Sequence, residues 1–169
     1  PQQQGPPPQQ PHESQDVVEL LRARLKWQPQ DDATAKATGR SLLFYATLAN
    51  DTETLRALLQ QHGPAGLNAP MRNANLAMGE QPFTPLISAM AFGSFELVRQ
   101  LLDARAIPEH RMATSGIDAL MFGAIMGRHD NVEAWVKYFH GAWPLERAEE
   151  TAGLTALQLA AQLAIPGEE

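Results

Sequence analysis

The strongest constraint on the fold is an internal repeat, which emerges when the sequence is aligned on Gly39, Pro82, Gly116 and Gly153. The aligned segments begin GRSLLFYATLAN, PFTPLISAMAFG, GIDALMFGAIMG and GLTALQLAAQLA, and their starts are 43, 34 and 37 residues apart. Leucine recurs at offset four from each start, as Leu43, Leu86, Leu120 and Leu157. Self-similarity at intervals of about 20–50 residues is typical of stacked repeats, so we expect a row of similar units.

Each unit has the pattern of a helix, a turn and a second helix. In the second unit Thr84 can cap the first helix, and Pro85 fits the first helical position, where its missing N–H costs nothing. Gly93 is expected to end this helix, and Ser94 can cap the next one. The residues predicted to face inward from the second helix are Leu97, Val98, Leu101 and Leu102. The residues expected to adopt a left-handed helix end, at offset eleven, are Asn50, Gly93 and Gly127.

In this register the units resemble ankyrin repeats, whose pattern is G-x-T-P-L-H-x-A-A-x-x-G-x-x-x-x-V-x-x-L-L. Three complete units match, at Gly39–Leu59, Pro82–Leu102 and Gly116–Val136, and a partial unit spans Gly153–Ala164. Val17, Leu20 and Leu21 are similar to the outer helix of an earlier unit whose inner helix is missing. The resemblance covers roughly residues 16 to 165 and implies an all-α, ankyrin-type helix-turn-helix solenoid with hairpin-like loops.

The chain divides into a tail and one repeat domain. Residues 1–15 begin PQQQGPPPQQP, a Pro/Gln-rich composition that cannot build a core, and we expect a disordered tail. This tail is either a plain linker or an SH3-type ligand. A helix is predicted over Asp16–Trp27, with Asp16 and Glu19 as a capping box. Within the domain 16–169, the units lie near residues 16–38 (partial), 39–81, 82–115, 116–152 and 153–169 (partial).

Two departures from the family pattern matter. The histidine that ties neighbouring ankyrin repeats is replaced by Phe44, Ile87, Met121 and Gln158. This predicts weaker or more apolar coupling between units. The stretch Gln60–Gln81 makes its unit about ten residues longer than the family's spacing of about 33, and it is interpreted as a loop insertion.

Composition excludes several classes of protein. The net charge is −6, the sequence pI is about 5.3, and the 13 Lys and Arg form no dense run, which argues against nucleic-acid binding. The absence of cysteine excludes disulfides, zinc fingers and thiol catalysis. The longest apolar run, Ala119–Gly127, is far shorter than the roughly 20 residues that span a membrane. We expect a soluble, intracellular protein, in the cytoplasm or in an organelle after loss of a targeting segment.

No pattern predicts chemistry, so we expect no enzyme and no catalytic, cofactor-binding or metal site. His129 and Glu133 are four residues apart, but no third ligand is placed nearby, and His129 is interpreted as an exposed helix start. The pair Glu149-Glu150 is interpreted as a solvated turn, since a glycosidase pair needs carboxylates across a cleft. Trp135 is expected in the core. Trp143 is assigned either to local packing or to an interface.

The resemblance implies protein binding, by an adaptor or an assembly subunit. In the family, offset one lies on the hairpin loop and offsets nine and ten lie on the concave face, where partners bind. Here these offsets predict an apolar stripe: Phe83, Phe92, Ile117, Ile125, Met126, Leu154 and Leu163. Leu48 and Arg40 hold the equivalent places in the first unit. The expected partner is an apolar helix or extended segment of another protein, with no nucleic acid and no membrane span.

Alternatives to this reading concern both the stripe and the role of the protein. The insertion Gln60–Gln81 could fold over the stripe, or the solenoid could pack on itself. The domain could also regulate a larger enzyme or channel whose catalytic part lies outside this chain, or be a permanent structural subunit of a complex. At the fourth unit, Leu157, Leu159, Leu163 and Ile165 lack an outer helix, so we expect a continuing chain, a partner or an atypical segment to cover them.

Overall fold

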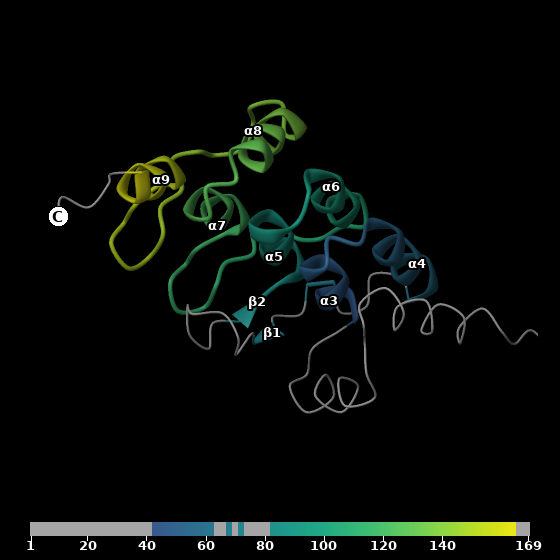
Figure 1. The fold of residues 1–169 in the computed structure, drawn as a ribbon. Coiled ribbons are helices and arrows are strands. Elements are labelled where there is room, and N and C mark those ends of the chain that lie inside the picture. Colours follow the sequence, from purple (N-terminus) through teal and green to yellow (C-terminus); the bar gives the residue numbers. More distant parts are fainter. Residues whose placement is uncertain (1–41, 63–66, 69–70, 73–81, 165–169) are drawn as a thin grey trace, which may run out of the picture.

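The computed structural model of the protein describes residues 42–62, 67–68, 71–72 and 82–164 (Figure 1). Within these ranges the regular secondary structure is helical apart from two short strands, and the all-α class is confirmed. The expected helix Asp16–Trp27 and the tail 1–15 lie outside the described residues. The helices are α3 (Leu42–Leu48), α4 (Thr52–His62), α5 (Pro85–Phe92), α6 (Phe95–Asp103), α7 (Ala119–Ile125), α8 (His129–Tyr138) and α9 (Ala156–Ala164).

The helices form two rows, which Figure 1 shows side by side. In the inner row α3, α5, α7 and α9 pack against one another in chain order, and in the outer row α4, α6 and α8 do the same. Each outer helix also packs against the inner helix that precedes it in the chain. The core therefore lies between the rows and along the inner row. It includes the leucines of the first three units at offset four, Leu43, Leu86 and Leu120.

The composition of α5 and α6 explains their different places. All residues of α5 from Pro85 to Ala91 are buried, as expected for a helix that is apolar on every side. The predicted cap is confirmed, because Thr84 Oγ1 accepts the N–H of Ile87 at 3.3 Å. In α6 the polar residues Glu96 and Arg99 are exposed and paired, and the predicted apolar face is buried. Ser94 precedes α6 without a side-chain cap hydrogen bond, so that expectation is wrong.

The turns between paired helices are of two kinds. Asn50 and Gly127 have φ angles of 52° and 66°, which confirms their predicted left-handed conformation. Gly93 is extended, with φ −95°, so the prediction is wrong there. The reason is that α5 continues one residue further than α3 and α7, to Phe92, which leaves a shorter turn. A side chain is disfavoured at Gly93 by a close contact instead, because a Cβ atom would lie 3.0 Å from the carbonyl oxygen of Ala89.

Polar side chains tie each helix pair to the next. The Oδ1 atom of Asn50 accepts the backbone N–H of Ser94 at 2.7 Å. The buried Nδ2 of Asn131 donates to the carbonyls of Met90 and Gly93, both at 3.0 Å. Carbonyls at helix ends lack intrahelical partners, and the Asn131 amide satisfies two of them, whereas Asn50 accepts the N–H of the residue that precedes α6. Polar ties between helix pairs are therefore present at positions other than those of the replaced histidine.

Hairpin-like connections lead from each outer helix to the next inner helix. The insertion Gln60–Gln81 is not purely a loop, because α4 extends to His62 and Leu67 is fully buried. Strand β1 (Met71–Arg72) pairs antiparallel with β2 (Pro82–Phe83). Before α7 the N–H of Met112 donates to the carbonyl of Ile117, and before α9 an isolated bridge joins Ala148 and Thr155.

Aromatic side chains close the core under α8. Trp135 is fully buried, as predicted, and its ring centroid lies 5.1 Å from that of Trp143. Phe139 packs against both rings. Trp143 is itself buried, so of its two interpretations the structure supports local packing.

Candidate functional site

The predicted apolar stripe is only partly present at the surface. Phe83 is fully buried, with its ring centroid 5.1 Å from that of Phe122. It pairs with Met71 between β1 and β2, so part of the insertion packs beside it. The prediction that Phe83 is available to a partner is therefore wrong. The repeat pattern could not reveal this, because the pairing residue belongs to an insertion without an equivalent in the other units.

A second group of predicted binding residues lies at the C-terminal ends of inner-row helices. Leu48, Phe92 and Ile125 end α3, α5 and α7, and each is half-buried. Phe92 packs edge-on against Phe122, with ring centroids 6.2 Å apart. Met126 follows α7 directly and is 39% exposed. These residues therefore offer a modest apolar surface, in which Met126 projects furthest into solvent.

The stripe residues that lie in loops contribute less exposed apolar surface. Ile117 and Leu154 lie in the connections before α7 and α9, and both are half-buried. Arg40 and the side chain of Leu163 lie outside the described residues. The large apolar side chains that the structure does expose elsewhere are Ile107, Leu145 and Leu157.

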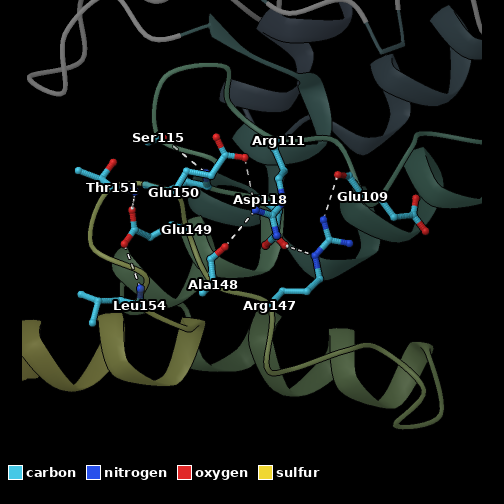
Figure 2. A network of polar contacts seen from close by, with 11 residues as sticks. Glu109, Arg111, Ser115, Asp118, Arg147, Ala148, Glu149, Glu150, Thr151 and Leu154 are labelled. Carbon is cyan, nitrogen blue, oxygen red and sulfur yellow. Dashed lines mark hydrogen bonds and ion pairs between the residues drawn. The ribbon is translucent and has the colours of Figure 1, made fainter.

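Sequence reasoning missed a network of polar contacts between the two connections before α7 and α9, shown in Figure 2. Its centre is Asp118, which is buried and is the N-cap residue directly before α7. One carboxylate oxygen accepts the N–H of Met121 at 3.0 Å, and the other lies 3.3 Å from Nε of Arg147. Burial raises the pKa of Asp118, against the hydrogen bond from Met121 and the charges of Arg147 and Arg111. We call the residues labelled in Figure 2 the loop network.

Two arginines extend the loop network to backbone carbonyls. Arg147 donates to the carbonyl of Glu109 at 3.2 Å and lies over the Trp143 ring, 5.2 Å from its centroid. Arg111 donates to the carbonyl of Ala148 at 3.0 Å and lies 3.7 Å from a carboxylate oxygen of Glu150. Each arginine therefore links the connection before α7 to the connection before α9.

Glu149 organises the turn before α9. Its side chain is buried against the backbone and accepts the N–H groups of Thr151, Ala152 and Leu154 at 2.6–3.0 Å. These donors, Leu154 foremost, hold the pKa of Glu149 below its ordinary value. The interpretation of Glu149-Glu150 as a solvated turn is thus wrong for Glu149, whereas Glu150 is exposed.

A signal for part of this network was present in the sequence. Offset two from each unit start holds a residue that caps helices well: Ser41, Thr84, Asp118 and Thr155. Asp118 uses its side chain as this pattern predicts, and Thr155 Oγ1 accepts the N–H of Gln158 at 3.4 Å. No local pattern identifies the arginine partners, because they come from loops about 30–40 residues away and loop conformation is weakly encoded.

The buried carboxylates of Asp118 and Glu149 hold other parts of the chain in place. Asp118 contacts the N–H of Met121 and the guanidinium group of Arg147, and Glu149 accepts the N–H groups of the turn before α9. Among the described residues, no cluster of His, Asp or Glu could hold a metal ion. His129 is exposed at the start of α8, and Glu133 pairs with Lys137. In the same part of the chain, no helix is long and apolar enough to cross a membrane.

Comparison with known proteins adds no relative: no protein-family model and no curated protein sequence matches this chain.

Proposed function

We propose that this chain is an ankyrin-type solenoid that acts as a protein-binding module, as an adaptor or an assembly subunit. The support for the solenoid is the two rows of helices joined by hairpin-like connections. A further argument is the register, since offset-four leucines are buried in three successive units. Stacked helix pairs make an extended surface without a deep pocket, which suits binding of another polypeptide.

The proposed binding surface lies at the C-terminal ends of the inner-row helices. It comprises Leu48, Phe92, Ile125 and Met126, with Ile117 and Leu154 on the neighbouring connections. The observation that carries the proposal is Met126, whose side chain is 39% exposed next to the half-buried Ile125. Methionine adapts its shape to apolar partners and is enriched at protein interfaces. The proposed partner is an apolar helix or an extended segment of another protein.

The structure directs the choice of test variant. Phe92 packs against Phe122 in the interior, so a charge at Phe92 would also disturb the fold. Met126→Asp places the charge at an exposed position, and Leu145→Asp is the matched control, since Leu145 is exposed in the connection between α8 and α9. Proteins captured from source cells are compared by quantitative mass spectrometry for the two variants and the unmodified chain.

The expected result is a partner that the unmodified chain and Leu145→Asp retain and that Met126→Asp loses. All three chains should show the same helical circular dichroism spectrum. A set of captured proteins that is unchanged by Met126→Asp would contradict the proposed surface.

A further inference from the structure

Two large apolar side chains are exposed at corresponding places in successive units. Ile107 lies in the connection between α6 and α7, and Leu145 lies in the connection between α8 and α9. Each is 48% exposed. A single exposed apolar residue is ordinary on a protein surface, whereas a contiguous group of them marks an interaction site. The question is therefore whether the two residues belong to one surface.

The two connections share a sequence pattern. The backbone N–H groups of Met112 and Glu149 each donate across the hairpin that follows, so these two residues correspond to each other. Counting back from them by the same number of residues, 107–110 (IPEH) corresponds to 144–147 (PLER). Each stretch begins with a proline and a large apolar residue, in either order, and its third residue is an exposed glutamate. The same combination of side chains thus recurs in two successive units.

Hydrogen bonds hold the two stretches side by side. The guanidinium group of Arg147 donates to the backbone carbonyl of Glu109 at 3.2 Å (Figure 2). Leu145 and Ile107 each lie two residues before one end of this bond, so the Cα atom of each is within about 7 Å of a joined residue. The N–H of Ile107 also donates to Oδ1 of Asn68 at 2.8 Å. Because the backbone is held at both stretches, this surface is formed before a partner arrives, which lowers the entropic cost of binding.

The charges beside the apolar residues are mainly acidic. Glu109 and Glu146 are exposed, and among the described residues neither carboxylate has an ion-pair or hydrogen-bond partner. In Figure 2 the side chain of Glu109 points away from Arg147. Arg147 and Arg111 lie against other carboxylates, at 3.3 Å and 3.7 Å, which leaves the exposed Arg105 to oppose the two glutamates. Such a surface attracts a cationic partner and disfavours anionic membranes and nucleic acids.

We propose that these two stretches form a second binding surface, for a segment of another protein that carries Lys or Arg beside large apolar residues. We call it the connection surface; its residues are Ile107, Pro108, Glu109, Pro144, Leu145 and Glu146. The apolar residues of the segment cover Ile107 and Leu145, and its basic residues pair with the two glutamates. Packed helices of successive units lie about 8–10 Å apart, a distance that an extended segment covers in about three residues. A segment with basic residues three positions apart therefore matches both units.

The connection surface is separate from the surface around Met126. Met126 directly follows an inner-row helix, whereas the connection surface lies on the chain that follows the outer-row helices. The two test variants of the Met126 surface therefore report on different partners. Leu145→Asp should keep the partner of the Met126 surface and lose the basic segment, and Met126→Asp should do the reverse. The two proposals can consequently fail separately.

Selection of binding peptides tests the apolar part of the connection surface. Random dodecapeptides displayed on phage are selected on the immobilised full chain, and each selected peptide is then tested on Met126→Asp, Ile107→Asp and Leu145→Asp. Peptides that Met126→Asp retains should bind Ile107→Asp and Leu145→Asp about tenfold more weakly or not at all, since a charge replaces an apolar contact. All three variants should keep the helical circular dichroism spectrum. These peptides should share Lys or Arg beside large apolar residues. If no peptide behaves in this way, or if those that do lack basic residues, the proposal is wrong.

Neutralising the glutamates tests the charge part with one of these peptides. Fluorescence anisotropy of the labelled peptide measures its dissociation constant for the full chain and for the double variant Glu109→Gln, Glu146→Gln. The double variant should bind about three- to tenfold more weakly at low salt, because two exposed ion pairs are lost. Added salt should weaken binding to the unmodified chain more than binding to the double variant. Glu133→Gln, on α8, is the control and should bind like the unmodified chain. Equal affinities of the double variant and this control would overturn the proposal.

Discussion

Helices α7 and α9 occupy equivalent places in their units but differ in what covers them. Leu120 of α7 lies between two rows of helices, whereas Leu157 of α9 faces solvent. Both leucines stand at offset four of the same pattern. The comparison shows that a repeat pattern specifies which side of a helix is made for packing, and that burial itself depends on the neighbouring helices.

The largest predicted effect is a difference in stability between alanine substitutions at these two leucines. Leu120→Ala should lower the free energy of unfolding by about 2–5 kcal/mol, because it leaves a cavity in a packed site. Leu157→Ala should change it by less than about 0.5 kcal/mol in dilute solution, where the side chain contacts mainly water. Urea denaturation followed by circular dichroism measures both. Equal losses for the two variants would show that α9 is covered within a single chain.

The next largest loss of stability is expected at Asn131, whose hydrogen bonds join the second and third helix pairs. Asn131→Ala should cost about 1–3 kcal/mol, because the buried carbonyls of Met90 and Gly93 lose their donor. Asn50→Ala, at the more exposed tie between the first and second pairs, is the comparison and should cost less. The same denaturation experiment checks the order, and an equal or larger loss at Asn50 would contradict it.

The two kinds of turn predict opposite tolerance of a side chain. Gly93→Val should cost about 1–3 kcal/mol, because its Cβ meets the carbonyl oxygen of Ala89 at 3.0 Å. Gly127→Asn should cost under about 1 kcal/mol, since no atom lies near a Cβ there and Asn50 adopts the same left-handed conformation. Thermal melts of both variants test this, and a neutral Gly93→Val would refute the assigned turn.

The loop network joins α9 to the covered part of the molecule, and its carboxylates predict a pH dependence. The N–H donors of Leu154, Thr151 and Ala152 hold the pKa of Glu149 below its ordinary 4.5. The unfolded chain then binds this proton more tightly, so the stabilisation is complete above about pH 4.5 and is lost as the pH falls through the lower folded pKa. Glu149→Gln should reduce stability at pH 7 and weaken this acid sensitivity.

The contribution of Asp118 to the pH dependence of stability should have the opposite sign to that of Glu149. Burial raises the pKa of Asp118 above 3.8, so the folded protein binds this proton more tightly than the unfolded chain. This group therefore destabilises the fold increasingly as the pH rises through the raised folded pKa. Melts of Glu149→Gln and Asp118→Asn between about pH 3 and pH 7 separate the two contributions. Glu146→Gln, in the exposed part of the same loop, is the control. Parallel pH profiles for all three variants would contradict the assignment.

The sequence predicted the helices and their order, because apolar periodicity and helix caps act within a few residues. The cap of Thr84, the inward face of α6 and the burial of Trp135 were all confirmed. The candidate surface was harder to predict. Phe83 is buried against Phe122 of the next unit, and Glu149 is held by backbone groups whose direction depends on the folded loop. Such contacts depend on tertiary placement, which the repeat pattern does not contain.

Hydrogen exchange of backbone amides in α7 and α9 tests most directly whether the neighbouring helices, rather than the repeat pattern alone, determine how well a helix of the inner row is protected. The amides of α9 should exchange faster than those of α7, because among the described residues α9 packs against α7 alone, whereas α7 packs against α5, α8 and α9. Equal protection of α7 and α9 would contradict this explanation.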